Sequence, residues 1–302
     1  MKSNRVRAAR GKLSASMAVF GTISLFVKHI SMPSAEIALF RAVIAIVILF
    51  FFHRIATGTF SLPVPRRELL PMLLSGAAMG FNWVLLFEAY RYTTVSVATL
   101  SYYFAPVLVM VLSPLLFHEH TNRKQRICFL FSTVGLVLVI NVGKISFGDR
   151  NWIGILFGLG AAGLYASVML LNKFCKHTRG LDRTLVQFAA AIVVLLGYVL
   201  LTSGITITTL DRTGLWNLLI LGTVHTGFCY CLFFSGIKEL PGQEAAILTY
   251  IDPFVSILVS VFLLHEPMTA LQCLGGVLIL GFTLLNELDL PLPARSTSTA
   301  KK

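Results

Sequence analysis

The sequence predicts an all-α integral membrane protein whose ten transmembrane helices form two inverted repeats of five helices. The first observation is composition: 56 % of the 302 residues are hydrophobic, 13 % are charged, and the mean hydropathy is +0.80. Soluble domains carry about 25 % charged residues, so this composition excludes a soluble globular chain. The second observation is a series of long apolar runs, and the third is an internal repeat.

The apolar runs set the number of helices. A transmembrane helix needs about 17–25 mostly apolar residues, and ten segments meet this requirement. The connections between them are short, so none can hold a soluble catalytic module. The expected spans are residues 14–31, 34–53, 69–90, 94–117, 127–143, 152–173, 184–202, 214–236, 243–264 and 269–288.

The distribution of Lys and Arg sets the orientation. With residues 1–13 and 289–302 as cytoplasmic tails, ten spans place 19 of the 25 Lys and Arg residues inside and 5 outside. Cytoplasmic loops carry such an excess, so we expect a multi-pass protein of the cell membrane with both termini in the cytoplasm. The net charge of +12 arises from these loops, and we therefore expect the lipid bilayer as partner and no nucleic acid.

Two stretches that begin at Phe87 and Phe234, 147 residues apart, align without a gap. We therefore expect a first repeat at residues 14–143 and a second at residues 152–288. Five spans is an odd number, so the second copy is inverted in the membrane, an arrangement typical of secondary transporters. The matches include Tyr103 with Tyr250, Pro106 with Pro253, His118 with His265 and Glu119 with Glu266.

These features resemble the EamA family of the drug/metabolite transporter superfamily. The resemblance rests on Phe40-Arg41-Ala42, on the prolines within spans four and nine, and on the glutamates that close those spans. It covers about residues 12–288 and implies a transporter, often an exporter of amino acids or other small metabolites. The chain departs from the family pattern in one place, because a histidine precedes each closing glutamate where a small residue is common.

Asp252 and Pro253 interrupt the apolar ninth span, and Asp252 aligns with Ala105 of the first repeat. A charged side chain inside a membrane costs roughly 2.5–3.5 kcal/mol on insertion scales, and a proline removes a backbone hydrogen bond. Irregular backbone at membrane depth is tolerated where it lines a cavity. We therefore expect this segment in the wall of a central site, with a buried, hydroxyl-bonded aspartate at a kink as the alternative.

Other polar and aromatic residues in the spans are candidates for the same site. Glu88 can instead pair with Arg91, His225 can bond Thr223 or Thr226, and each tyrosine can serve in packing. The candidates for substrate binding are Asn82, Trp83, Tyr102, Tyr103, His225, Tyr250 and Asp252. The candidates for proton coupling are Asp252, Glu88 and His225.

A further group is expected to hold the fold. Arg41 follows Glu36 by five residues, which favours an ion pair or hydrogen bonds to helix ends over binding of a substrate carboxylate. Glu119 and Glu266 each precede the next helix by a few residues, and a carboxylate near a helix N-terminus is stabilised by the helix dipole. The structural candidates are Arg41, Pro106, Pro253, Glu119 and Glu266.

The sequence thus predicts a secondary transporter, with export favoured, of small organic metabolites such as amino acids or amphipathic compounds. It would act by alternating access around a central cavity, as a monomer or homodimer. No GxxxxGK[ST] motif for ATP is present, and we expect no cofactor and no metal. The alternatives are a channel-like facilitator and a membrane-embedded lipid-modifying enzyme built on His118-Glu119-His120. Adjacent helical residues point in different directions, so this run is a poor metal site and we expect no enzyme.

Overall fold

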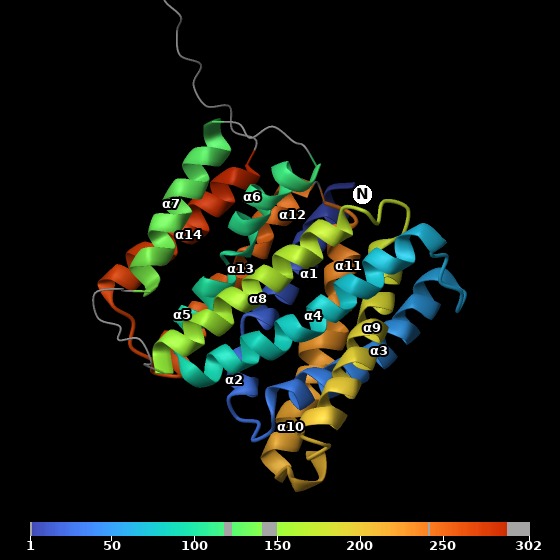
Figure 1. Ribbon diagram of the computed structural model, residues 1–302. Coiled ribbons are helices and arrows are strands. Elements are labelled where there is room, and N and C mark those ends of the chain that lie inside the picture. Colours follow the sequence, from blue (N-terminus) through green and yellow to red (C-terminus); the bar gives the residue numbers. More distant parts are fainter. Residues whose placement is uncertain (1, 118–122, 141–149, 241, 289–302) are drawn as a thin grey trace, which may run out of the picture.

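The computed structural model describes residues 2–117, 123–140, 150–240 and 242–288, all of whose regular elements are helices (Figure 1). The first half contains α1 (Lys2–Phe20), α2 (Ile23–Val27), α3 (Ser34–Thr57), α4 (Arg66–Tyr92), α5 (Val95–Tyr102), α6 (Ala105–Phe117) and α7 (Arg123–Ile140). The second half contains α8 (Arg150–Asn172), α9 (Gly180–Thr202), η2 (Ile207–Thr209), α10 (Arg212–Ile220), η3 (Leu221–Phe228), α11 (Cys229–Ile237), α12 (Gly242–Thr249), α13 (Ile251–Leu258), η4 (Val259–Leu263) and α14 (Ala270–Glu287).

Each expected span corresponds to one helix or to one interrupted helix in the described part of the chain. By length and composition, six of these units are apolar and long enough to cross a membrane, and two shorter apolar helices follow near the C-terminus. The six are Ser34–Thr57, Arg66–Tyr92, Val95–Phe117, Arg150–Asn172, Gly180–Thr202 and Arg212–Ile237. The predicted all-α membrane fold is therefore confirmed.

The two repeats run in opposite directions. The amide of Val95, at the start of α5, donates to Glu266, which follows η4 at the end of the related helix of the second repeat. Helices from different repeats also pack together, with α4 against α8 and α9, and α3 against α9 and η3. The protein is thus two interleaved inverted repeats and not two separate bundles.

The pair formed by α3 and α9 is fastened at both ends. The Glu36 carboxylate, in the first turn of α3, accepts from the backbone amide and the hydroxyl of Thr206, both at 2.8 Å. At the other end, His53 Nε2 lies 2.9 Å from Asp182 Oδ1, and both side chains are buried. At each end, a side chain of the first repeat therefore contacts a residue of the second repeat.

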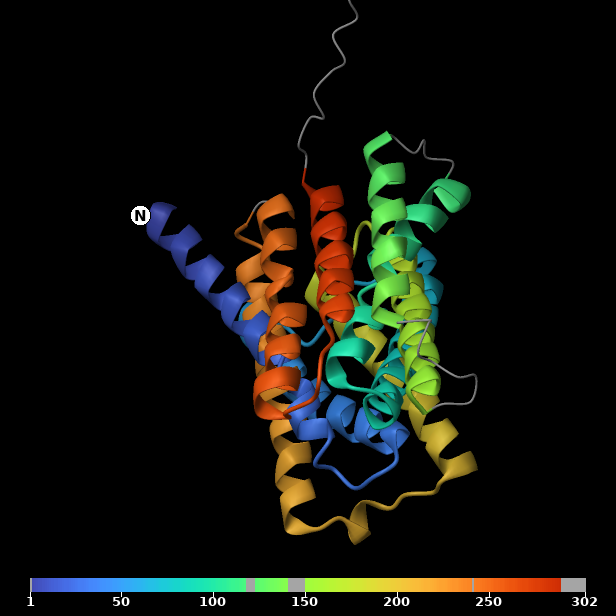
Figure 2. The same cartoon turned by 90° about the vertical axis from the view of Figure 1, so that its left-hand side faces the viewer.

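The pair formed by α7 and α14 lies side by side at one edge of the molecule (Figures 1 and 2). Their backbones meet at two glycines: a Cβ on Gly135 would lie 2.7 Å from the Gly275 carbonyl oxygen, and one on Gly275 would lie 2.5 Å from the Gly135 carbonyl oxygen. Small residues allow such close packing of membrane helices. These helices are spans five and ten, one from each repeat.

Two departures from the expected spans concern the first and eighth helices. The first helix begins at Lys2, so helix extends through the segment expected as a tail, and it is interrupted at Gly21 and Thr22 before α2. The eighth is wound as a π-helix at η3, around His225. Short π segments are frequent at functional sites, and neither irregularity contains a proline that would reveal it in the sequence.

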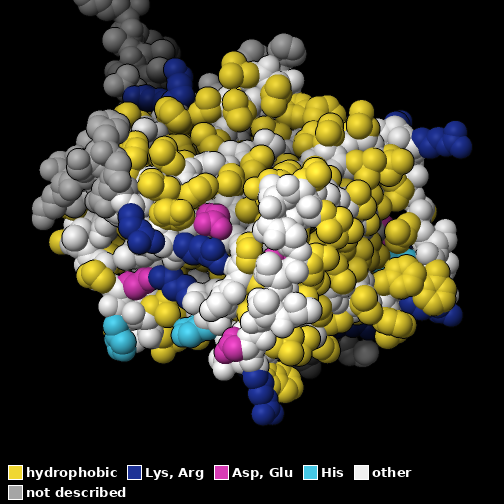
Figure 3. All heavy atoms as spheres, turned by 60° about the horizontal axis from the view of Figure 1, so that its bottom comes forward, with side chains coloured by type: hydrophobic (Ala, Val, Ile, Leu, Met, Phe, Trp, Pro, Cys, Tyr) yellow, Lys and Arg dark blue, Asp and Glu magenta, His cyan; other side chains and the backbone are white. Residues whose placement is uncertain are grey.

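The molecule has two ends, named here by the helices found there (Figure 2). The α10 end carries the start of α10 and residues 28–33 and 264–269, and the α1 end carries the start of α1. Figure 3 shows the α10 end, where several charged side chains of both signs lie together beside broad hydrophobic surface. Large apolar side chains such as Leu201, 89 % exposed, and Ile55, 83 % exposed, lie on the surface as expected for contact with lipid.

Candidate functional site

Two broken helices meet near the centre of the molecule. The fourth span breaks between α5 and α6 at Tyr103 and Phe104, and the ninth breaks between α12 and α13 at Tyr250. Tyr103 and Tyr250 are 147 residues apart, the spacing of the sequence repeat. Pro106 and Pro253 each lie in the first turn of the helix that follows the break. N–H groups in a first turn have no partner within the helix, so a proline there removes no helical hydrogen bond. The break is therefore a shared feature of both repeats.

The breaks are joined by a hydrogen bond. The Tyr103 hydroxyl donates to Asp252 Oδ2 at 2.6 Å. The interruption in the first helix lies against the same point, because a Cβ added to Gly21 would lie 2.6 Å from the Asp252 carbonyl oxygen. Three helix interruptions thus converge on Asp252.

A cavity of about 520 Å³ lies at this junction, within the range of about 300–1,000 Å³ typical of small-molecule sites. Aromatic side chains form much of its wall, among which Tyr102 stacks on Tyr165 with ring centres 5.3 Å apart. Asn82 reaches the cavity while donating to the Ala161 carbonyl oxygen at 2.6 Å. The predicted substrate-binding residues found in the wall are Asn82, Trp83, Tyr102, Tyr103, Tyr250 and Asp252.

His225 and Glu88 lie outside the cavity wall formed by the described residues. His225 is 3 % exposed, and its Nε2 lies 2.9 Å from the Thr22 hydroxyl instead of bonding Thr223 or Thr226. No local pattern in the sequence indicates this contact, because it depends on the interruption between α1 and α2. Glu88 Oε1 lies 3.7 Å from Arg91 Nη1, which is the pairing expected as the alternative to a role in the site.

Arg41 also lines the cavity and forms no ion pair with Glu36, whose carboxylate is bonded to Thr206. The Arg41 guanidinium carbon lies 4.4 Å from the centre of the Trp83 ring and 5.3 Å from that of Phe87. Such distances permit cation–π attraction. The structure therefore places Arg41 in the wall of the site. The five-residue spacing from Glu36 had instead favoured an ion pair or hydrogen bonds that stabilise the fold.

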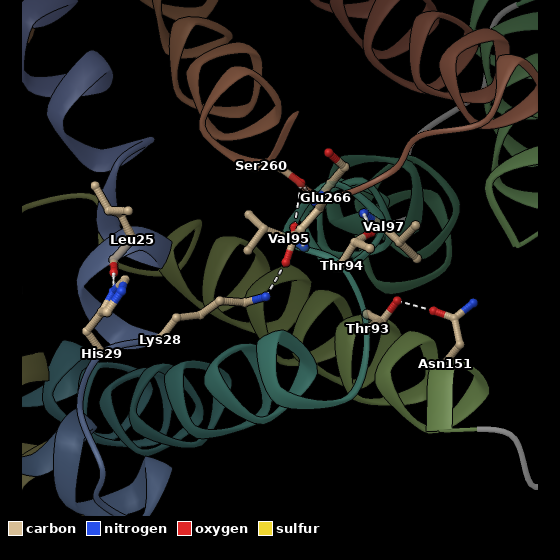
Figure 4. Close-up of polar contacts among 11 residues, drawn as sticks. Leu25, Lys28, His29, Thr93, Thr94, Val95, Val97, Asn151, Ser260 and Glu266 are labelled. Atoms are coloured by element: carbon tan, nitrogen blue, oxygen red, sulfur yellow. Dashed lines mark hydrogen bonds and ion pairs between the residues drawn. The ribbon is translucent and has the colours of Figure 1, made fainter. Parts of the chain in front are cut away.

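At the α10 end, successive hydrogen bonds join α5 to α13 and η4. Next to the cavity, the Thr99 and Ser256 hydroxyls lie 2.9 Å apart. In the next contact along the helices, the Ser96 amide donates to the Ser260 hydroxyl at 3.1 Å. Glu266 completes the series, as it accepts from the Val95 amide at 2.7 Å (Figure 4). These contacts close the cavity at this end.

Glu266 connects more than two elements. Its carboxylate also accepts from the Ser260 hydroxyl at 2.6 Å and pairs with the ammonium of Lys28, just after α2 (Figure 4). Glu119, which aligns with Glu266 in the first repeat, lies outside the described residues, as do His118 and His120. Among the described residues, no cluster of three His, Cys, Asp or Glu side chains could hold a metal ion.

At the α1 end, the continuations of the broken helices follow different neighbours. Helix α6 packs against α7 and α8, whereas α12 packs against α1 and α14. The cavity wall extends in this direction to Asn172, the last residue of α8, and to Arg183 in the first turn of α9. The cavity wall therefore reaches toward the α1 end, whereas the contacts of α5 with α13 and η4 lie between the cavity and the α10 end.

Comparison with known proteins agrees with this architecture. The EamA-like transporter family matches residues 12–141 and 152–287. "Uncharacterized transporter YxxF" of Bacillus subtilis (strain 168) is 29 % identical over 272 residues, 89 % of this chain and 86 % of the relative. "Probable amino-acid metabolite efflux pump" of Salmonella typhimurium (strain LT2) is 27 % identical over 233 residues, 74 % of this chain and 78 % of the relative.

A solved crystal structure with the same fold can be compared with this chain. It superposes with a TM-score of 0.63 at 16 % sequence identity, over 93 % of this chain and 96 % of the other. The family match covers both five-helix halves. The chain therefore belongs to the EamA-like transporter family.

Proposed function

We propose that this protein is a secondary transporter that exports small organic metabolites, such as amino acids or amphipathic compounds, by alternating access. The observation that carries the proposal is the contrast between the two ends of the central cavity. Side chains from α5 and α13 seal the α10 end through Thr99 and Ser256, whereas the wall reaches Arg183 near the surface of the α1 end. A carrier with one end sealed and the other accessible is one state of an alternating-access cycle.

The distribution of Lys and Arg supports the direction of export. The excess of these residues in the connections at the α1 end favours a cytoplasmic position for that end and for both termini. The cavity then loads from the cytoplasm of a cell-membrane protein. The name of the Salmonella relative, an efflux pump, agrees with this direction.

The wall of the cavity supports a zwitterionic or amphipathic solute. Asp252 offers a carboxylate for an ammonium group, Asn82 offers an amide, and the aromatic rings offer faces for apolar and cationic groups. All of these groups come from one chain, so a monomer can form the site and a homodimer would contain two. The proposed activity involves no covalent chemistry, so it requires no cofactor.

Asp252 is the residue that we propose to link binding to movement. Its carboxylate accepts the Tyr103 hydroxyl at the point where the two broken helices touch. A substrate ammonium group or a proton at this carboxylate would compete with the Tyr103 bond and weaken the innermost contact between the repeats. Opening of the α10 end would then require loss of the remaining hydrogen bonds between α5 and the residues from α13 to Glu266, and of the Lys28–Glu266 ion pair.

The experiment that tests this function is flux in proteoliposomes with a panel of amino acids and organic cations, each with and without an imposed pH gradient. We expect saturable flux that responds to the gradient and falls by at least about tenfold in Asp252→Asn, the loss expected for one charged hydrogen bond of about 1.5–3 kcal/mol. Glu239→Gln, at an exposed acid after α11, is the control and should transport normally.

Two outcomes would count against the proposal in different ways. Absence of saturable flux for every panel member would contradict the transport of such metabolites. Normal flux by Asp252→Asn at all pH values would leave a transporter but remove Asp252 from its mechanism.

A further inference from the structure

Arg41 is a buried cation for which the described residues provide no anionic partner. It is 3 % exposed, and its guanidinium stacks on Trp83 and Phe87. Its Nε atom is buried and has no hydrogen-bond partner among the described residues. The Glu36 carboxylate, the acid nearest to Arg41 in sequence, is bonded to Thr206.

Such a group is costly unless an anion reaches it. A guanidinium has five N–H donors and no acceptor, and an unpaired buried charge is strongly unfavourable. The two aromatic rings attract the positive charge, but they carry no carboxylate that could neutralise it. Because Arg41 lines the cavity, a solute in the cavity can supply the missing anion.

The repeated fold does not require a cation at this position. Helix α9, which begins 146 residues after α3, is its counterpart in the second repeat. At a spacing of 146 or 147 residues from Arg41 it carries Gln187 and Phe188, both neutral. Phe188 packs on the same Trp83 ring, with ring centres 5.2 Å apart. A position shared by the repeats is thus occupied by a charge in one copy only.

We propose that Arg41 binds the carboxylate of the transported solute, which makes it a specificity-determining residue; this inference rests on the transport function proposed above. The planar guanidinium matches a carboxylate through two parallel hydrogen bonds. With Asp252 in the same wall as acceptor for an ammonium group, the solute class is a zwitterionic amino acid. The aromatic wall favours one with an apolar or aromatic side chain.

The test compares solutes that differ only in the carboxylate. Counterflow in proteoliposomes is measured for phenylalanine and phenethylamine, and for leucine and isoamylamine. We expect wild type to prefer the carboxylated member of a pair by at least about tenfold, since a site built to bond a polar group discriminates against analogues that lack it. Arg41→Gln should reduce this preference at least about tenfold while flux of the amine persists, and Arg41→Lys should reduce it less.

Arg54→Gln is the matched control. Arg54 lies on the same helix and also stacks on an aromatic ring, 5.0 Å from the centre of Phe60, but it is not part of the cavity wall among the described residues. Its variant should keep the wild-type preference. Equal loss of flux for both members of a pair in Arg41→Gln, with the preference unchanged, would overturn the assignment and make Arg41 structural.

A second measurement needs no variant at Arg41. The melting temperature of purified wild-type protein should rise more with phenylalanine or 3-phenylpropanoate than with phenethylamine, because only the first two carry the carboxylate. Equal stabilisation by all three compounds would contradict a carboxylate site even where transport is observed. Saturable flux for other members of the panel, but neither transport nor stabilisation by any of these compounds, would overturn the role of Arg41 alone. Absence of saturable flux for every panel member would overturn the proposed function, and the role of Arg41 with it.

Discussion

The two broken helices share a backbone design and differ in charge beside the break. Both break at a tyrosine and resume with a proline in the first turn, at Tyr103 and Pro106 in one copy and at Tyr250 and Pro253 in the other. The residue before the proline is a fully buried alanine in the first copy and Asp252 in the second. The tyrosine and the proline, which both copies share, accompany the break in each helix. Asp252 is present in one copy only, so it is not needed for the break and can serve binding.

The largest expected effect comes from placing the acid in the wrong copy. Ala105 is 0 % exposed, so Ala105→Asp would bury a carboxylate without the hydroxyl that Tyr103 gives to Asp252. We expect a loss of several kcal/mol of stability, since an uncompensated buried charge costs about 3–5 kcal/mol. The yield of monodisperse protein in detergent and its melting temperature measure this loss.

The control for that experiment is Ala105→Ser, which adds a small neutral polar group at the same place. A variant Ala105→Asp that melts like wild type would show that either break accepts an acid. The asymmetry between the copies would then carry no functional meaning.

A second comparison sets Glu266 against another acid at the α10 end. Glu266→Gln would lose the charge-assisted bonds to Lys28, Ser260 and the Val95 amide. Hydrogen bonds to charged groups contribute about 1.5–3 kcal/mol each, so we expect the population open at this end to rise by about tenfold or more. A cysteine at Ser96 in a Cys273→Ser background reports this opening through its rate of modification from the outside.

Glu88→Gln is the control because its carboxylate faces Arg91 at 3.7 Å and takes no part in the contacts between α5 and η4. Modification of the cysteine at Ser96 should remain slow in this variant. Equal rates in the two variants would mean that Glu266 does not hold the α10 end closed.

The contact of the first helix with the second break allows a third test. A Cβ on Gly21 would meet the Asp252 backbone oxygen at 2.6 Å, whereas one on Gly163 in α8 would meet nothing within 4 Å. We expect Gly21→Ala to lose about 1–3 kcal/mol through overpacking and Gly163→Ala to be neutral or slightly stabilising. The difference between the two melting temperatures measures the effect, and equal values would contradict the close approach at Asp252.

The sequence was sufficient to predict the helical membrane fold, the pairing of Tyr103 with Tyr250, and the place of Asp252 beside a break. Hydropathy and a proline next to an acid are recognised within one segment, and the repeat is recognised by aligning the sequence with itself. None of these patterns requires knowledge of which helices pack together. The contact of His225 with Thr22 and the position of Arg41 on Trp83 could not be predicted in this way. Both depend on which faces of distant helices meet. For Arg41, the nearby acid Glu36 suggested an ion pair that the structure does not contain.

The smallest expected effect concerns the hydroxyl of Tyr103. Tyr103→Phe removes the donor to Asp252 Oδ2 and keeps the ring that lines the cavity. An ordinary hydrogen bond contributes about 0.5–1.5 kcal/mol, and we expect this lower range because the Asp252 carboxylate keeps contact with the cavity. The apparent KM for transport should therefore change by up to about tenfold while stability stays near wild type. Tyr165→Phe removes a hydroxyl from the same wall, but Tyr165 has no hydrogen bond to Asp252 among the described residues. This variant should therefore change the KM less. Equal changes in both variants would indicate that hydroxyl groups anywhere in the wall act alike, and that the bond between the two breaks has no special part in the transport cycle.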